Sequence, residues 1–215
     1  MSNILFPDQH LYLEKTIQNT DSLFSEMEIF AKENNIPILE KISANFLEQL
    51  LIICKPKLVL EIGTAIAYSS IRISKFLPSD GELDTIELSS HNIKLAKNFI
   101  LRSNESKINL IEGDALKIIP KLNAEYDFIF LDSDKKDYET LFKLSYEKLK
   151  TGGIILIDNL LWKGFTASEN VPENYKQSTQ IIRKFNYLFL NFPGLKSSIL
   201  PIGDGLGLAI KIEKE

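Results

Sequence analysis

The chain has few of the residues and runs that define several common protein classes. Its 215 residues include one cysteine, Cys54, and two histidines, His10 and His91, so neither an intrachain disulfide nor a tetrahedral Cys/His zinc site can form. No apolar run reaches the roughly 18 residues of a membrane-spanning helix. The first ten residues contain no basic segment followed by an apolar stretch, so no signal peptide is predicted. We therefore expect a cytoplasmic protein that works away from membranes.

Charge and composition narrow the class further. The formal net charge is −4, which argues mildly against a nucleic-acid-binding protein, although a local basic patch can sit on an acidic protein. The 44% of hydrophobic and 25% of charged residues are typical of a globular chain. This length predicts a single domain, in which we assign residues 1–55 to N-terminal helices and residues 56–215 to an α/β core.

The pattern of apolar residues predicts helices first and an α/β sheet afterwards. Residues 8–35 predict two short helices with a break near Thr20 and Asp21, and a third helix runs from Pro37 to Pro56. Short apolar runs then alternate with helix-length segments, which predicts parallel strands at 58–62, 83–88, 108–112, 127–131 and 153–157. A helix over 174–191 and an antiparallel pair of strands over 199–203 and 206–213 complete the predicted fold.

The turn after the first predicted strand is the first candidate site. Glu61 and Gly63 end this strand in the segment LEIGTAIAYSS, and Ser69 and Ser70 begin a helix. A helix N-terminus at the carboxyl edge of a parallel sheet is where α/β folds bind ligands. The dinucleotide fingerprint G-x-G-x-x-G and the phosphate-binding P-loop are both absent from the sequence. Taken alone, the turn is also typical of an ordinary strand–helix connection.

Small and acidic residues follow the next two strands. Glu87 lies 24 residues after Gly63, where a carboxylate can accept hydrogen bonds from both hydroxyls of a ribose. After the third strand come Gly113, Asp114 and Ala115, and Asp114 can cap the next helix, accept from an adenine amino group, or do both. Each carboxylate could instead be a solvated strand end. Their succession predicts an adenosine-containing ligand across the edge of the sheet.

The ends of the fourth and fifth strands predict a metal site. Asp132 follows the fourth strand, and Asp158 and Asn159 follow the fifth. Neighbouring parallel strands end at the same edge, so these side chains offer hard oxygen ligands that suit Mg²⁺ and are also compatible with Mn²⁺ or Ca²⁺. A bound cation would explain two carboxylates placed so close together. Lys135 lies three residues after Asp132, as a candidate general base or as a solvated lysine.

Other residues with reactive or aromatic side chains give weaker signals. Trp162 follows the fifth strand closely and can border a substrate pocket, although a lone tryptophan is more often a packing residue. His10 and His91 fall in helical stretches of surface character, and Cys54 lies on an apolar helix face that is typical of a core.

Taken in order, these segments resemble the cation-dependent O-methyltransferases that use S-adenosylmethionine (SAM), a group that includes the caffeoyl-CoA and catechol enzymes. The resemblance covers the chain from about residue 36 onward and rests on E-I-G-T-x-x-x-Y-S-S, the second-strand glutamate, G-D-A, L-D-x-D-K, D-N-x-L and I-G-D-G-L. It implies a Rossmann-like seven-stranded sheet with helices on both faces, an antiparallel last strand and extra N-terminal helices. It also implies a homodimer.

The same resemblance implies roles for individual residues. Asp132, Asp158 and Asn159 would hold Mg²⁺, and Lys135 falls where the catechol-type enzymes place a base, so that Lys135 and Asp132 form the predicted catalytic pair. With the strand ends considered above, the predicted SAM-binding residues are Leu39, Glu61, Gly63, Ser69, Glu87, Gly113, Asp114, Ala115 and Asp132.

Within this group, five segments resemble the bacterial tRNA 5-hydroxyuridine methyltransferases, which make 5-methoxyuridine at the wobble position of the anticodon. These segments are PILEK, PKLVLEIGTAIAYSSIRIS, DNLLWKG, FNYLFLNFP and SSILPIGDGL. Two positions depart from the pattern. Ala67 stands where the family usually has glycine, which would cost about 1 kcal/mol if this position requires a positive φ. Asp134 stands where the tRNA enzymes often have alanine.

The chemistry leaves the acceptor open. A hydroxyl must lose its proton to attack a methyl group, and a metal that activates it also binds a second oxygen on the neighbouring carbon. Catechols provide this pair, and so does 5-hydroxyuridine with its C4 carbonyl. We predict methylation of 5-hydroxyuridine in the tRNA anticodon loop, with a small catechol-like substrate as the alternative and a SAM-binding protein without catalysis as a third hypothesis. A basic rim would favour tRNA, and its candidate residues are Lys135, Lys136, Lys163, Arg183 and Lys184.

Overall fold

Three helices precede the sheet in the computed structural model, which describes residues 6–17 and 21–213. They are α1 (Pro7–Thr16), α2 (Ser22–Glu33) and α3 (Lys41–Cys54). The two predicted short helices are confirmed, and Asp21 caps α2 by accepting a hydrogen bond from the Leu23 amide. Thr20 of the predicted break and residues 1–5 of the segment tested for a signal peptide lie outside the described residues.

The third helix begins four residues later than predicted. Residues 37–40 are not helical, Glu40 has extended backbone angles, and the Leu39 side chain is buried in the core at 4% exposure. Burial of Leu39 therefore competes with the helix-starting tendency of Pro37, and the prediction that this proline starts the helix is wrong.

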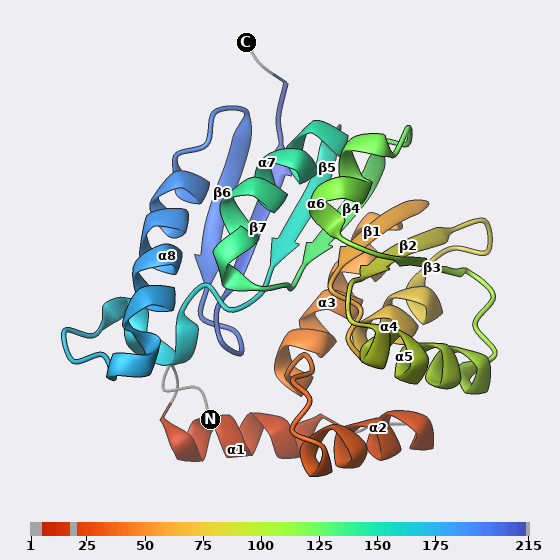
Figure 1. The fold of residues 1–215 in the computed structure, drawn as a ribbon, viewed down its shortest axis with the longest axis horizontal. Helices are drawn as coiled ribbons and strands as arrows, with labels where there is room; N and C mark the ends of the chain where they lie inside the picture. The colour runs from red at the N-terminus through yellow and green to blue at the C-terminus, as the bar shows by residue number, and fades with distance from the viewer. Residues whose placement is uncertain (1–5, 18–20, 214–215) are drawn as a thin grey trace.

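Seven strands form one sheet in the order β3-β2-β1-β4-β5-β7-β6 (Figure 1). Their bounds are β1 (Leu58–Ile62), β2 (Glu82–Glu87), β3 (Ile108–Glu112), β4 (Tyr126–Leu131), β5 (Leu149–Ile157), β6 (Leu195–Leu200) and β7 (Leu206–Lys211). The neighbouring strands among β1 to β5 pair in parallel, and β7 runs antiparallel to both β5 and β6. The predicted α/β fold with an antiparallel last strand is confirmed.

The sixth strand was predicted too late in the sequence. It ends at Leu200, whereas the prediction placed it over 199–203. Pro201 has no amide hydrogen for a strand ladder, and Gly203 has a φ of +56°, so the chain turns here instead of continuing the strand. The loop that follows brings Asp204 back toward the end of β5.

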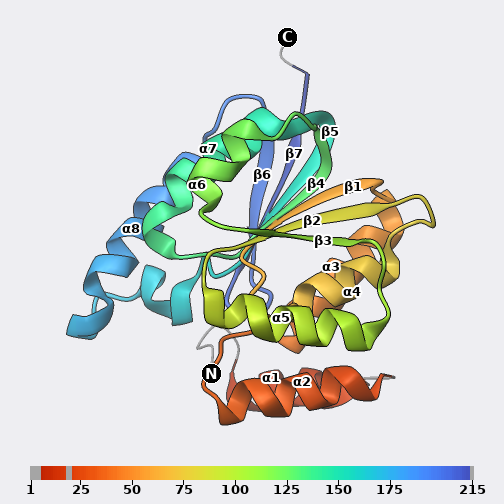
Figure 2. The same cartoon turned by 45° about the vertical axis from the view of Figure 1, so that its right-hand side comes forward.

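Helices cover both faces of the sheet, as Figure 2 shows. The bounds of the remaining helices are α4 (Tyr68–Phe76), α5 (Ser90–Ser103), α6 (Ala115–Ile118), α7 (Tyr138–Lys148) and α8 (Glu173–Leu190). Strand residues alternate between two cores, because successive side chains point to opposite faces. In β4, Phe128 and Phe130 pack on the α3–α5 side, while Ile129 and Leu131 pack on the α6–α8 side. Helices α1 and α2 lie outside the α3–α5 layer.

Two predictions about single residues are wrong and one is right. His10 is buried at 7% exposure, because α1 packs on α3, and its Nε2 atom lies 3.4 Å from Glu14 Oε1. Cys54 is exposed, because it is the last residue of α3 and points away from the core. His91 is exposed, as predicted. Among the described residues, no helix is long and apolar enough to cross a membrane.

Candidate active site at the carboxyl edge of the sheet

A cavity of about 830 Å³ opens at the carboxyl ends of the central strands. It lies where the chain, after building β1, β2 and β3 outward in one direction, returns to place β4 on the other side of β1. Open α/β sheets bind ligands at such a reversal of strand order. The volume is within the range of small-molecule and cofactor sites.

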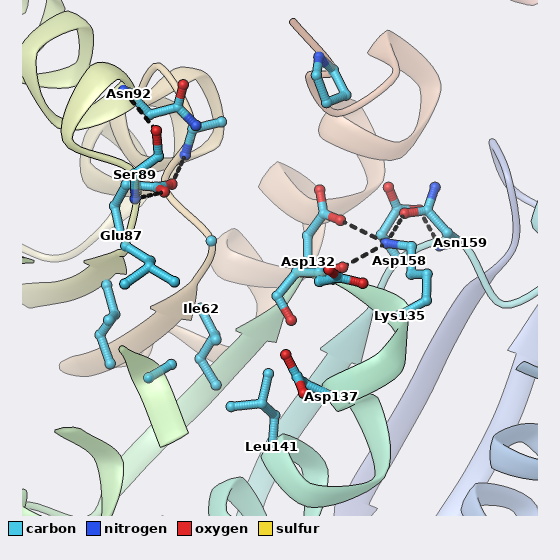
Figure 3. A pocket seen from close by; sticks show the side chains of 18 of the residues that line it. Ile62, Glu87, Ser89, Asn92, Asp132, Lys135, Asp137, Leu141, Asp158 and Asn159 are labelled. Carbon is cyan, nitrogen blue, oxygen red and sulfur yellow. Dashed lines mark hydrogen bonds and ion pairs between the residues drawn. The ribbon is translucent and has the colours of Figure 1, made fainter. Parts of the chain in front are cut away.

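Most of the predicted site residues line this cavity, and three do not. Those that line it are Gly63, Glu87, Gly113, Asp114, Ala115, Asp132, Lys135, Asp158 and Asn159. Figure 3 shows two polar groups on opposite sides, with Glu87, Ser89 and Asn92 on one and Asp132, Lys135, Asp158 and Asn159 on the other. Leu39, Glu61 and Ser69 are buried at 4%, 0% and 8% exposure and are absent from the wall. Leu39 packs in the core, and Glu61 and Ser69 lie beneath the loop after β1.

Glu87 is held by two backbone amides. Its Oε2 accepts from the Ala65 amide and its Oε1 from the Ser89 amide, both at 2.8 Å. The carboxylate thereby joins the loop after β1 to the start of α5, where Ser89 caps the helix. A carboxylate has about four lone-pair positions, so each oxygen can still accept a further hydrogen bond from a ligand hydroxyl. Sequence reasoning identified Glu87 but not Ala65, whose contribution is a backbone amide and carries no side-chain signal.

The loop between β1 and α4 needs unusual backbone angles. Gly63 has a φ of +102°, and a Cβ atom there would stand 1.8 Å from the Asp132 carbonyl oxygen, so only glycine fits between the two strand ends. Ala65 and Ala67 have φ values of +48° and +70°. The suspected positive φ at Ala67 is therefore present, and this left-handed angle costs about 1–2 kcal/mol in a residue other than glycine.

Glu61 supports this loop from below. It is fully buried, its Oε2 accepts from the Ser70 hydroxyl and, at 2.6 Å, from Thr85 Oγ1, and Thr85 Oγ1 lies 2.6 Å from Thr64 Oγ1 in the loop. Burial raises the pKa of Glu61 to about 7, while hydrogen bonds from Ser69, Ser70 and Thr85 partly offset this rise. Glu61 lies beneath the loop after β1 and is not part of the cavity wall.

The raised pKa of Glu61 predicts a pH-dependent stability. A folded-state pKa of about 7 lies above the ordinary value of 4.5, so the stabilising contribution of the neutral carboxyl is complete below pH 4.5 and is lost as the pH rises through 7. Glu61→Gln cannot titrate. The free energy of unfolding of the wild type should therefore fall relative to Glu61→Gln between these two pH values, by on the order of 3 kcal/mol. Urea denaturation at both values measures this difference, and parallel pH dependences in the two proteins would contradict it.

The strand ends of β4 and β5 bring the predicted metal ligands together. The Asp132 amide donates to Ile62 O and the Asp158 amide to Leu131 O, which continues the sheet register into the site. Asn159 has a φ of +62°, and its amide donates to Asp158 Oδ1 at 2.7 Å. Burial and the neighbouring Asp132 raise the pKa of Asp158 well above its ordinary value. Two carboxylates are thus packed close together at a cost that a bound cation would remove.

Lys135 lies among these oxygens. Its Nζ atom is 3.3 Å from Asp132 Oδ1 and 2.6 Å from Asn159 Oδ1, so an ammonium group bridges two of the three predicted metal ligands. It also donates to the Tyr138 hydroxyl at 2.6 Å, and that hydroxyl donates to Asp158 O at 3.0 Å. The sequence analysis missed Tyr138, although its position three residues after Lys135 was available as a signal.

The donor set fits a hard cation. The described residues contain no group of three or more His, Cys, Asp or Glu side chains placed to hold a metal. The predicted ligands are instead two aspartates and an asparagine, which offer oxygen atoms only, and a cationic group already interacts with two of them. Water or substrate oxygens would complete the coordination.

The predicted basic rim does not converge on the cavity. Of its five residues, only Lys135 and Lys163 line the wall. Lys136 pairs with Asp134 and Lys184 with Glu139, while Arg183 donates to backbone carbonyls of residues 165, 166 and 168. Against the two lysines, the wall carries seven carboxylates, which are Glu87, Asp114, Asp132, Asp134, Asp137, Asp158 and Asp204. Among the described lining residues, Trp162 is the one aromatic side chain, as the sequence had suggested.

Known proteins that match this chain are O-methyltransferases of the same fold. The family described as O-methyltransferase matches residues 10–212. A caffeoyl-CoA O-methyltransferase from Eucalyptus gunnii is 31% identical over 86% of this chain and 79% of its own length. The tapetum-specific methyltransferase 1 of Arabidopsis thaliana is 29% identical over 99% of this chain and 91% of its own. The crystal structure of an O-methyltransferase from Bacillus cereus in complex with SAH has a TM-score of 0.83 at 25% identity and covers 95% of this chain and 97% of that one.

Proposed function

Since this chain belongs to the O-methyltransferase family that includes the caffeoyl-CoA O-methyltransferases, it is a SAM-dependent O-methyltransferase, and we propose that its acceptor is a hydroxyl with a second oxygen on the neighbouring carbon. The proposal includes a divalent cation, Mg²⁺ or a similar ion, held by Asp132, Asp158 and Asn159. The observation that carries it is the convergence of these oxygen ligands beside Lys135 at one end of the cavity.

The opposite end of the cavity suits the nucleoside of SAM. Both oxygens of Glu87 keep lone pairs for ribose hydroxyls while their amide bonds hold the carboxylate in place. Asp114 accepts from the Leu116 amide at 3.0 Å and still faces the cavity, which agrees with the predicted double role as helix cap and adenine acceptor. Gly63 lets the loop pass close to β4 between the two ends. SAM supplies an electrophilic methyl group, and the cavity has to aim it at the acceptor oxygen.

At the acceptor end, the residues hold the oxygen pair and take its proton. When bound, the cation favours the ionised form of the hydroxyl and fixes the orientation of both acceptor oxygens. Lys135 Nζ stands beside the same ligands, and in its neutral amine form it is placed to take the hydroxyl proton. Asp132 is a proposed ligand of the cation and also contacts Lys135 Nζ, which agrees with the predicted pairing of Asp132 and Lys135 in catalysis.

A small catechol-type phenol is the acceptor class that the relatives support. The matched relatives include proteins named as caffeoyl-CoA O-methyltransferases. The excess of carboxylates on the wall and the scattered basic rim also suit a small acceptor better than a polyanion.

The second candidate is 5-hydroxyuridine in a tRNA anticodon loop. It rests on the five segments that resemble the tRNA enzymes and on Trp162, which lines the acceptor end and offers a face on which an extruded base can stack. The homodimer that the resemblance implies remains a prediction for either acceptor.

A product assay separates these acceptors. The protein is incubated with SAM, Mg²⁺ and either a catechol panel that includes caffeoyl-CoA or tRNA carrying 5-hydroxyuridine, with and without EDTA, and products are identified by mass spectrometry. We expect methylated product from one acceptor class that disappears with EDTA. Methyl transfer that persists in EDTA would overturn the cation, and no product from either class by protein shown to bind SAM would overturn the acceptor assignment.

A further inference from the structure

Asp204 is a buried carboxylate that the proposed mechanism does not use. It lies in the loop between β6 and β7, is 7% exposed and borders the acceptor end of the cavity. Its Oδ1 accepts from the Lys163 amide at 2.5 Å, and its Oδ2 accepts from Asn159 Nδ2 at 3.4 Å. Its backbone oxygen accepts from the Leu161 amide at 2.9 Å. The Asp204 side chain thus connects the β6–β7 loop to the segment that follows β5.

The contact with Asn159 bears on which atom of that side chain faces the proposed cation. An asparagine amide has one oxygen, which accepts, and one nitrogen, which donates. Asn159 Oδ1 lies 2.6 Å from Lys135 Nζ, and Nδ2 points to Asp204. A carboxylate can only accept, so the charged form of Asp204 favours the orientation in which the amide oxygen faces the cation. The flipped orientation would present an NH₂ group to the cation and an oxygen to a carboxylate.

The contact with Lys163 holds a strained stretch of the cavity wall. Trp162, Lys163 and Gly164 have φ values of +47°, +58° and +81° in succession. Left-handed angles are unfavourable in residues other than glycine, so the surrounding structure must hold the first two residues in place. The hydrogen bond from the Lys163 amide to Asp204 is one such restraint in the middle of this run.

We propose that Asp204 is a positioning residue that orients the Asn159 amide toward the cation and fixes the Trp162–Gly164 wall of the acceptor site. The inference rests on the proposed cation site. The inference also follows from matching donors to acceptors. The Asn159 side-chain amide and the Lys163 backbone amide each donate to a different oxygen of the Asp204 carboxylate. Asparagine at position 204 would offer one oxygen to these two donors and would set an NH₂ group against the other.

The test uses Mn²⁺ binding by the full chain, measured by calorimetric titration, and thermal unfolding without metal. Asp204→Asn is expected to raise the Mn²⁺ dissociation constant about 10- to 100-fold, as for other residues that orient metal ligands, with SAM affinity unchanged. Asp134→Asn is the matched control, because it removes the same charge from the cavity wall at an exposed residue that pairs with Lys136. We expect it to bind Mn²⁺ as the wild type does.

A double variant tests the pairing without reference to the metal. Asn159→Asp alone sets two carboxylates against each other, whereas Asn159→Asp combined with Asp204→Asn exchanges donor and acceptor and restores both hydrogen bonds. We expect each single variant to lower Tm by several degrees and the double variant to recover most of that loss. Additive losses in Tm, or an Asp204→Asn protein that binds Mn²⁺ as tightly as the wild type, would overturn the inference. A wild type that binds no Mn²⁺ would instead overturn the proposed cation site, while the unfolding data would still report on the pairing.

Discussion

Replacing Asp158 with asparagine is expected to lower kcat by about 10³-fold or more, because a cation that favours the ionised hydroxyl is worth several kcal/mol of transition-state stabilisation. The side chain keeps its shape and can still accept from the Asn159 amide. Removing a buried negative charge next to Asp132 also relieves repulsion, so the metal-free variant should be at least as stable as the wild type. Steady-state kinetics, calorimetric SAM binding and thermal unfolding together measure the effect.

The loss should be confined to catalysis and metal binding. SAM affinity should change little, because the proposed nucleoside contacts lie on the opposite side of the cavity at Glu87 and Asp114. Asp134→Asn, which removes a carboxylate from the same cavity, should keep near wild-type kcat. An Asp158→Asn enzyme with activity within about tenfold of the wild type would contradict the role of this residue as a metal ligand.

Replacing Lys135 with methionine is expected to lower kcat by about 10²- to 10⁴-fold, the usual contribution of a general base. Methionine keeps an apolar stem of similar length beside the rings of Tyr138 and Trp162, over which the ammonium now lies at 4.6 and 5.7 Å. The variant therefore removes the proton acceptor with little change in packing.

Mn²⁺ affinity distinguishes this role from that of Asp158. In the metal-free arrangement Lys135 Nζ interacts with Asp132 and Asn159, so its removal takes away a competitor for the cation. Lys135→Met should bind Mn²⁺ at least as tightly as the wild type despite its low kcat. Lys136→Met is the control, because its ammonium is exposed and pairs with Asp134. Weaker Mn²⁺ binding together with wild-type kcat in Lys135→Met would contradict the assignment.

The sequence carried enough information for the sheet and for the residues at its carboxyl edge. Apolar runs bounded by Gly, Asp and Pro predicted the five parallel strands, and a parallel sheet brings their carboxyl ends to one edge. This is why Asp132, Asp158 and Asn159 could be placed together before any coordinates were considered. The positive φ at Ala67 could be anticipated for a different reason, because the resembling family usually has glycine at this position.

Other features depended on packing that no local pattern reports. Asp204 reaches the site because β7 inserts between β5 and β6, so the loop that precedes β7 lies beside the end of β5. Glu61 was predicted to bind the cofactor from its position at a strand end. It shares the face of Val59 and is buried beneath the loop, and its contact with the cofactor stays a prediction. Leu39 packs in the core and α3 begins only at Lys41, which no local pattern reports, and the contact of Leu39 with the cofactor stays a prediction of the resemblance.

The central claim is that a divalent cation is held by the ends of β4 and β5, and anomalous diffraction tests it most directly. Crystals grown with SAH and Mn²⁺ would be measured at the manganese absorption edge. The account predicts one strong anomalous peak within coordination distance of oxygens from Asp132, Asp158 and Asn159, with Lys135 Nζ displaced from its present position between Asp132 and Asn159. A cavity that contains SAH but shows no peak at these residues, with Lys135 still bridging them, would contradict it.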